Sequence, residues 1–347
     1  MDKDNRINSN SNSKSAKNSN ILHIGGKKIN LLESTVKKVN KRLPNKGMTK
    51  KLASLLYYRN EHSTLRKAYQ NSIYCAEFIK QENGKYTSSY CKNRWCLVCQ
   101  RIRMGKLINE KVPRLKQCKN LYFVTISRPN VKGKELKGEI TDFNKTYAKI
   151  TRSRTYKKYI DKGCIGIVKS ECTIRPNDEY HYHKHILVDN KEFGLFIRHE
   201  WMRLNPTAHA KGQDFEKVYK RDGSFLEIFK YMTKLIGKDA KGKSFIDVVR
   251  LNVIFEAFSG KQVFKNIGKK ESWKLEPTEE KQEKVEEDIL DEIEETSSNG
   301  IEVFKFIDTE DFWGYYEVKS GETLAEVEAI GDIADIAEII NGKKETE

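Results

Sequence analysis

The 347-residue sequence lacks any long run of apolar residues, and only 37% of its residues are hydrophobic. No stretch reaches the 18 or so apolar residues that a membrane-spanning helix needs, so we expect no transmembrane segment and no membrane partner. The first twenty residues are mostly Asn, Ser, Lys and Asp without an apolar core, which excludes a secretory signal. These two absences predict a cytoplasmic protein.

Cysteine and histidine are scarce, with seven of each, yet both are clustered. Four cysteines fall between residues 75 and 99, and three histidines fall between residues 181 and 185. Disulfides are rare in the cytosol, where grouped cysteines are more often metal ligands or buried thiols. The clustering therefore points to two candidate metal sites.

Acidic residues are scarce before Glu271 and abundant after it. The final segment, from Glu271 to the end, holds 25 acidic and 7 basic residues, whereas the preceding part holds 58 basic and 24 acidic residues. A body with a net charge of +34 predicts a polyanionic partner, and nucleic acid is the first candidate.

Composition and residue patterns divide the chain into four predicted regions. These are a disordered polar tail (1–30), a basic helical region with the cysteine cluster (31–118), a domain of mixed strands and helices (119–270) and an acidic region (271–347). Within them we expect basic helices over 31–74 that are interrupted at Pro44–Gly47. We also expect one helix over about 139–160 and another within 245–270 with apolar Val249, Leu251, Ile254, Phe255 and Phe258.

The cysteine cluster consists of Cys75, Cys91, Cys96 and Cys99. Cys96 and Cys99 form a C-x-x-C knuckle, whose short loop brings two thiolates onto one tetrahedral ion. A redox-active pair would account for these two cysteines but leaves Cys75 and Cys91 unexplained. The spacing therefore favours a structural zinc site, and nearby arginines suit it to nucleic acid.

The three histidines lie in a predicted hairpin. Residues 163–174 and 180–188 read as strands, joined by a turn at 175–178, and the β-branched segment 121–127 reads as a further buried strand. Alternation along a strand places His181, His183 and His185 on one face. A turn centred on Asn177 sets Glu171 opposite His183, where its carboxylate can join the histidines as an oxygen ligand.

A predicted helix after residue 224 carries Glu227 and Tyr231, which are four residues apart and therefore neighbours on one helix face. Lys234 lies close to them. A helical tyrosine is most often a core residue, and only the pairing with a carboxylate and a metal site makes this one a candidate for chemistry.

These motifs, in this order along residues 75–265, resemble the replication initiators of small rolling-circle plasmids from Gram-positive bacteria, in the HUH endonuclease superfamily. The resemblance implies an α+β fold with a ferredoxin-like core. In that fold the 119–270 region is the endonuclease domain, the zinc-knuckle and basic helical region precedes it, and the acidic module follows. It also implies an enzyme that binds the double-strand origin, nicks one DNA strand, and works with a host helicase and polymerase.

The same resemblance implies the roles of individual residues. His183, His185 and Glu171 would hold Mg²⁺ or Mn²⁺ over the scissile phosphate, with His181 as an additional candidate. Tyr231 would attack and form a 5′-phosphotyrosine with a 3′-OH primer, and Glu227 would activate water for the terminating cut, with Lys234 nearby.

The superfamily pattern places a hydrophobic residue between the two ligand histidines, whereas this chain has Lys184. The pair His181 and His183 satisfies that pattern, so the metal pair is either 181/183 or 183/185. We favour the second, because Ile186–Val188 then continues the strand. Other readings are a histidine-triad nucleotide hydrolase, a zinc-knuckle regulator without catalysis, and a relaxase or transposase of the same superfamily.

Overall fold

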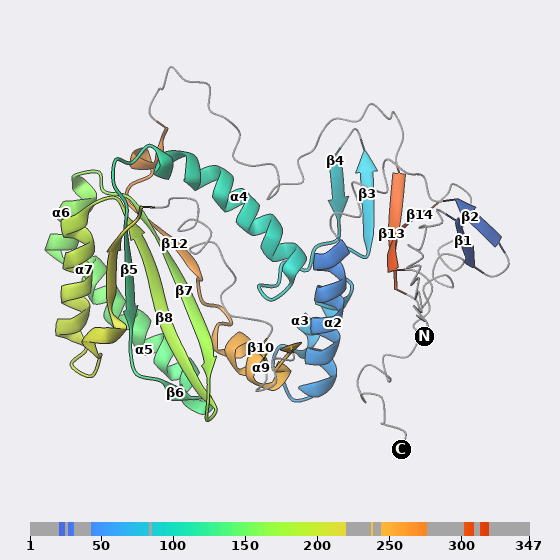
Figure 1. Ribbon diagram of the computed structural model, residues 1–347, viewed down its shortest axis with the longest axis horizontal. Helices are drawn as coiled ribbons and strands as arrows, with labels where there is room; N and C mark the ends of the chain where they lie inside the picture. Colours follow the sequence, from blue (N-terminus) through green and yellow to red (C-terminus); the bar gives the residue numbers. More distant parts are fainter. Residues whose placement is uncertain are drawn as a thin grey trace, which may run out of the picture.

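A central antiparallel sheet organises the part of the chain that the computed structural model describes, which is residues 21–24, 27–30, 43–82, 85–219, 237–238, 244–275, 302–308 and 313–318. The strand order is β12-β7-β8-β5-β9, and short β6 also pairs with β8. The six strands are Tyr122–Ser127 (β5), Val131–Lys132 (β6), Gly166–Arg175 (β7), Glu179–Val188 (β8), Asp214–Lys217 (β9) and Phe264–Ile267 (β12). The predicted combination of helices with a central antiparallel sheet is confirmed (Figure 1).

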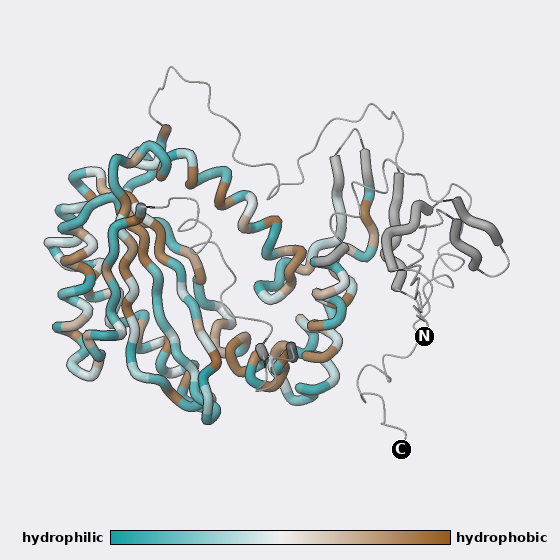
Figure 2. The backbone as a smooth tube through the Cα atoms, in the orientation of Figure 1, coloured by the Kyte–Doolittle hydropathy of each residue, from teal (hydrophilic) through white to brown (hydrophobic). Residues whose placement is uncertain are grey.

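The two faces of this sheet are covered by different helices. The helices are Leu97–Lys116 (α4), Gly133–Arg152 (α5), Arg154–Asp161 (α6), Lys191–Leu204 (α7) and Val248–Ala257 (α9). Because strand side chains alternate, Val168 and Ile186 join the main core with α5, α6, α7 and α9. Ile167 and Leu187 face the other way and pack with α4 in a second core. Figure 2 shows hydrophobic residues along the central strands and hydrophilic residues near the β7–β8 turn.

The hairpin formed by β7 and β8 has the predicted register. Glu171 pairs with His183, and Thr173 pairs with His181. The turn places Asn177 and Asp178 at positive φ, a conformation that these two residue types tolerate. The side-chain register of the candidate site is therefore set locally by the turn.

The predicted break at Pro44–Gly47 is wrong, because helix α2 runs from Leu43 to Arg59 through it. A proline in the first helical turn costs no backbone hydrogen bond, so it starts the helix rather than ending it. Lys46 is also anchored there, since its Nζ donates to Ile73 O at 2.9 Å and contacts Glu77 at 2.6 Å. The second helix of this region, α3, spans Arg66–Ile73.

One of the two other helical predictions needs correction. The single helix expected over 139–160 is two helices, α5 and α6, because Ser153 ends the first and its side chain accepts a hydrogen bond from Tyr156 N at the start of the second. The helix expected within 245–270 forms as α9, in which Leu251, Ile254 and Phe255 are buried and Val249 is 59% exposed.

A second sheet joins two regions that composition separated. It has the order β14-β13-β3-β4 and combines Phe78–Glu82 (β3), Lys85–Ser88 (β4), Glu302–Asp308 (β13) and Trp313–Val318 (β14). The predicted polar tail likewise overlaps a hairpin of Ile21–Ile24 (β1) and Lys27–Asn30 (β2). The remaining elements are Gly237–Lys238 (β10), Ser244–Phe245 (β11) and the short 3-10 helices Ala210–Gly212 and Glu271–Trp273.

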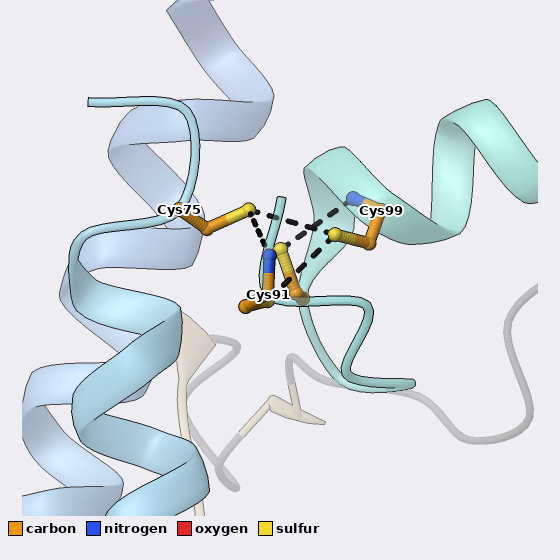
Figure 3. A group of neighbouring side chains, drawn as sticks. Cys75, Cys91 and Cys99 are labelled. Atoms are coloured by element: carbon orange, nitrogen blue, oxygen red, sulfur yellow. Dashed lines mark hydrogen bonds between the residues drawn. The ribbon is translucent and has the colours of Figure 1, made fainter. Parts of the chain in front are cut away.

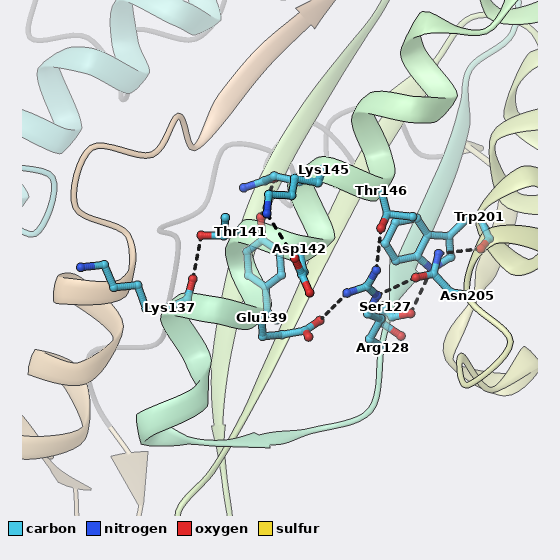
Figure 4. A network of polar contacts seen from close by, with 12 residues as sticks. Ser127, Arg128, Lys137, Glu139, Thr141, Asp142, Lys145, Thr146, Trp201 and Asn205 are labelled. Atoms are coloured by element: carbon cyan, nitrogen blue, oxygen red, sulfur yellow. Dashed lines mark hydrogen bonds and ion pairs between the residues drawn. The ribbon is translucent and has the colours of Figure 1, made fainter.

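The end of β5 is held by a polar network that fixes the sheet against its helices (Figure 4). The Arg128 guanidinium donates to Asn205 Oδ1 at 2.6 Å and to Thr146 Oγ1 at 2.8 Å, so it links α5 to the end of α7. Trp201 Nε1 donates to Ser127 O at 3.0 Å. Buried polar groups that are all paired in this way hold a strand end in one position.

Candidate metal centres and family membership

Glu171, His183 and His185 come together on the sheet face that α4 partly covers. Their ligand atoms all lie within 4.8 Å of one another. The Nε2 atoms of His183 and His185 are 3.0 Å apart, and His185 Nε2 is 3.6 Å from Glu171 Oε2. Neighbouring ligands of an octahedral ion at about 2.1 Å are separated by about 3.0 Å, so this donor set suits one divalent cation. Two imidazoles and a carboxylate accept several metals, so they do not identify which one.

The opposite ring nitrogens of these histidines are also engaged. His185 Nδ1 lies 3.2 Å from Thr125 Oγ1, and His183 Nδ1 lies 3.3 Å from His181 O. Such contacts fix the orientation of a metal-binding imidazole. The His181 side chain instead contacts Asn130 Oδ1 at 3.0 Å and is not part of the ligand group. The geometry thus brings together 183 and 185, and not 181 and 183.

The pKa values of two ligand candidates favour the protonation states that bind a cation. Burial, and next the neighbouring His185, lower the pKa of His183 to about 4, so its imidazole is neutral near pH 7 and can act as a ligand. Burial opposes ionisation of Glu171, but Lys169 and the two histidines outweigh it, and the pKa of this carboxyl lies below its ordinary value. At physiological pH the site therefore offers a neutral His183 imidazole and a Glu171 carboxylate beside the His185 ring.

Lys169 was not singled out from the sequence. It lies on β7 two residues before Glu171 and on the same face, its side chain is fully buried, and its Nζ is 2.6 Å from Glu171 Oε2. A lysine between Val168 and Ser170 in a strand gives no sign that it is paired with a metal-ligand candidate. The Lys169 ammonium thus neutralises the Glu171 carboxylate, as a bound metal cation would also do.

We expect Lys169→Met to destabilise the metal-free protein by about 3 kcal/mol, because it leaves the Glu171 carboxylate without its buried partner. Mn²⁺ should then raise the melting temperature of this variant more than that of the wild type, since the ion replaces the missing charge. Calorimetry with and without Mn²⁺ measures both effects, with Lys265→Met, an exposed lysine on β12, as the control. Equal Mn²⁺ shifts in wild type and Lys169→Met would contradict this role.

Lys184 occupies the position between the two histidines and points to the opposite face. Its side chain is buried, with Nζ donating to Ser170 Oγ at 2.7 Å and to Tyr182 OH at 3.0 Å, beside the ring of Phe143. Burial and the charge of Lys265 lower its pKa to about 7. A lysine can occupy this core position because its methylene chain packs among aromatic rings and its ammonium group donates hydrogen bonds to two hydroxyl oxygens.

The buried Lys184 predicts a pH dependence of stability. Between pH 7 and about 10 the unfolded chain binds a proton at this lysine that the folded chain does not, so the free energy of unfolding rises with pH. Relative to Lys184→Met, the wild type should gain up to about 4 kcal/mol across this interval. Urea unfolding at pH 7, 8.5 and 10 measures the difference, and Lys137→Met, on exposed α5 surface, should follow the wild type. If the free energy of unfolding changed with pH in the same way for wild type and Lys184→Met, the Lys184 ammonium would not be desolvated.

The four cysteines predicted as a zinc site form a single cluster, with ligand sulfurs within 4.8 Å of one another (Figure 3). Cys99 Sγ is 3.5 Å from Cys75 Sγ and 3.7 Å from Cys91 Sγ. Tetrahedral ligands at about 2.3 Å from a zinc ion are separated by about 3.8 Å, whereas a disulfide bond is about 2.0 Å long. The spacing therefore fits a four-sulfur metal site rather than disulfides.

Backbone amides surround these sulfurs. Cys91 N donates to Cys75 Sγ at 3.4 Å, Lys92 N to Cys99 Sγ at 3.2 Å, and Cys99 N to Cys96 Sγ at 3.4 Å. Hydrogen bonds from the neighbouring thiols, first Cys75, hold the pKa of Cys91 below its ordinary value. Amide hydrogen bonds to sulfur favour the thiolate, which is the form that binds metal.

Three predicted site residues lie outside the described residues. They are Glu227, Tyr231 and Lys234, in the segment between residues 219 and 237. Their roles and their placement relative to the histidines remain predictions.

Comparison with known proteins identifies the family. The sequence profile of the replication protein family matches residues 84–311, which is more than half of the chain. The chain therefore belongs to the replication protein family. Among the described residues, none of the helices combines the length and the apolar composition needed to cross a bilayer.

Several curated proteins are similar to this chain, and each carries the name Protein rep. The protein from Staphylococcus aureus is 26% identical over 181 residues, covering 48% of this chain and 77% of the relative. That from Lentilactobacillus hilgardii is 29% identical over 154 residues, covering 42% and 45%, respectively. The Streptococcus pneumoniae protein is 25% identical over 228 residues, covering 58% and 70%. No solved structure matches the chain.

Proposed function

We propose that this protein initiates rolling-circle replication of a plasmid by nicking one strand of the origin in a metal-dependent reaction of the HUH type. The observation that carries the proposal is the group Glu171, His183 and His185, whose ligand atoms lie within 4.8 Å in a chain of the replication protein family. The net charge of +34 before Glu271 supports DNA as the partner.

The three ligand candidates would hold Mg²⁺ or Mn²⁺, which stabilises the charge that develops on the scissile phosphate. The chain supplies the rest. Tyr231 Oη attacks phosphorus, the bond from phosphorus to the 3′-oxygen breaks, and the phenolic proton is lost while the 3′-oxygen becomes a hydroxyl. The product is a 5′-phosphotyrosine with a 3′-OH primer. Lys169 holds the Glu171 carboxylate in place, and Glu227 activates a water molecule for the terminating cut.

The finer architecture follows the same proposal. The sheet with α5 and α7 corresponds to a ferredoxin-like HUH core in residues 119–270, and the cysteine cluster to a structural zinc knuckle within 31–118. The acidic region 271–347, whose strand β13 pairs with β3, has no assigned role. Origin duplex, single-stranded DNA at the nick, and a host helicase and polymerase are the partners.

The test is nicking of single-stranded origin DNA by the purified full-length chain. With Mn²⁺ we expect cleaved product, and EDTA or His183→Ala should lower its yield at least about a hundredfold, because one of three ligands is lost. His199→Ala is the matched control, since that histidine is 79% exposed on α7. Tight DNA binding without any cleavage would favour a non-catalytic regulator. Release of nucleoside monophosphate would favour a nucleotide hydrolase.

A further inference from the structure

A pocket of about 360 Å³ lies where the loop before α4 meets the edge strand β12. Its volume falls within the range of about 300–1,000 Å³ that small-molecule sites occupy. Among the residues that the structure describes, the lining side chains are basic, amide or apolar, and none is acidic: Lys92, Arg94, Gln100, Arg103, Gln262, Val263 and Phe264. The pocket thus suits a ligand that is anionic on one side and flat or amide-like on the other.

The basic side of the pocket is positioned by the cysteine cluster. Arg103 Nη2 donates to Lys92 O at 2.9 Å, and its Nη1 donates to Gln100 Oε1 at 3.3 Å. Lys92 has φ of 59°, and its backbone N–H donates to Cys99 Sγ at 3.2 Å. The loop that carries Lys92 and Arg94 is therefore fixed by the same sulfurs that form the candidate zinc site.

The cations of this pocket repel one another. The half-buried Arg94 lies beside Arg103 in the pocket lining, and its Nη1 donates to Phe258 O at 3.5 Å, at the limit of a hydrogen bond. An anion between the two guanidinium groups would relieve this repulsion, and phosphate accepts two parallel guanidinium hydrogen bonds.

The apolar side of the pocket leads to the metal centre. Phe264 pairs with Lys169 across β12 and β7, so the two side chains share a sheet face. Lys169 in turn contacts Glu171. One strand spacing and two residues along a strand separate Phe264 from Glu171, which is roughly 8 Å. A ligand that packs on the Phe264 ring would therefore lie next to a group bound at the candidate metal site.

We infer that this pocket binds one nucleotide of the single-stranded DNA next to the scissile phosphate. Arg94, Arg103 and Lys92 contact the phosphate, the base stacks on Phe264, and the amides of Gln100 and Gln262 face its polar edge. A phosphate alone would contact only the cationic side chains. A nucleotide would contact the cations through its phosphate, the Phe264 ring through its base, and the glutamine amides through the polar edge of the base. The location beside the nick rests on the proposed function, whereas binding of a single strand does not.

The test measures DNA binding without metal, so that no cleavage occurs. Labelled single-stranded origin oligonucleotides carrying one abasic site at successive positions are titrated with the wild type, Phe264→Leu and Arg94→Gln. Phe196→Leu on α7 and Arg152→Gln on α5 are matched controls on the opposite face of the sheet. Zinc content and circular dichroism establish that each variant is folded.

One position should stand out. There the abasic site weakens wild-type binding about tenfold, and Phe264→Leu, which weakens the intact strand to a similar extent, shows no further loss. Arg94→Gln should reduce the slope of affinity against salt by about one phosphate contact, and Arg152→Gln should not. Additive effects of Phe264→Leu and every abasic site, or an unchanged salt slope in Arg94→Gln, would overturn the inference.

Nicking by the same variants separates this inference from the proposed function. If wild type cleaves with Mn²⁺ but the abasic effects are additive, only the nucleotide pocket is wrong. If Phe264→Leu and one abasic position are coupled in binding but no cleavage occurs, the nucleotide pocket is supported and the nicking proposal fails. Coupling at a position far from the mapped nick would overturn the placement beside the metal centre.

Discussion

Tyr231→Phe is expected to abolish the covalent protein–DNA adduct. With Mn²⁺ and single-stranded origin DNA, the wild type should give a band of higher mass on a denaturing gel, because the tyrosine oxygen becomes esterified to the 5′-phosphate. Phenylalanine keeps the ring but lacks the nucleophilic oxygen, so the adduct should fall below detection. Binding of the same DNA should change little, since the hydroxyl is a small part of the contact.

The chain offers a matched control for this experiment. Tyr219 is 83% exposed and lies only twelve residues earlier, so Tyr219→Phe should form the adduct at the wild-type level. Mass spectrometry of the digested adduct identifies the modified residue. An adduct of undiminished yield in Tyr231→Phe would refute the assignment of this tyrosine and redirect attention to another nucleophile.

Glu227→Gln provides a second reading of the same site. If Glu227 activates water only for the terminating cut, this variant should form the adduct but release it slowly. Loss of adduct formation together with release would instead assign the carboxylate to the first step.

The candidate metal centre was predictable because its geometry is local. A two-residue period and a turn that accepts positive φ at Asn177 and Asp178 together fix which side chains oppose one another, so Glu171 could be placed opposite His183. The sulfur cluster was also predictable, since four cysteines grouped between residues 75 and 99 match the spacing of a structural metal site.

Features that depend on distant segments were not predictable in the same way. Periodicity does not reveal that β3 pairs with β13, which follows it by more than two hundred residues. It also does not distinguish Lys169 and Lys184, neighbours in the sheet, from solvated lysines, although both are buried. Their partners lie on β7 and β8 themselves, Glu171 for Lys169 and Ser170 and Tyr182 for Lys184, but the burial of both lysines results from packing that the sequence pattern does not show. Pro44 misled the prediction because its effect depends on whether it starts a helix or interrupts one.

Loss of the cysteine cluster is expected to have the largest effect on stability. We expect the wild type to contain about one zinc ion per chain, and Cys99→Ser, which removes the sulfur next to both Cys75 and Cys91, to lose it. Structural zinc sites contribute on the order of 10 kcal/mol to folding in small domains. A loss of even several kcal/mol would lower the melting temperature by on the order of 10 °C in a domain of this size.

The cluster is coupled to the main core through Ser72 and Trp95. Ser72 Oγ is 3.5 Å from Cys91 Sγ and accepts a hydrogen bond from Trp95 Nε1 at 3.2 Å, and the Trp95 ring packs 5.4 Å from that of Phe255 in α9. Collapse of the cluster should therefore expose Trp95, which tryptophan fluorescence reports as a red shift in Cys99→Ser. Cys118→Ser is the control, because that buried cysteine lies outside the cluster and serine can keep its hydrogen bond to Arg114 O. A Cys99→Ser variant that keeps its zinc and its emission spectrum would show that the four sulfurs do not act together as ligands, and the loop carrying Lys92 and Arg94 would then owe its position to packing alone.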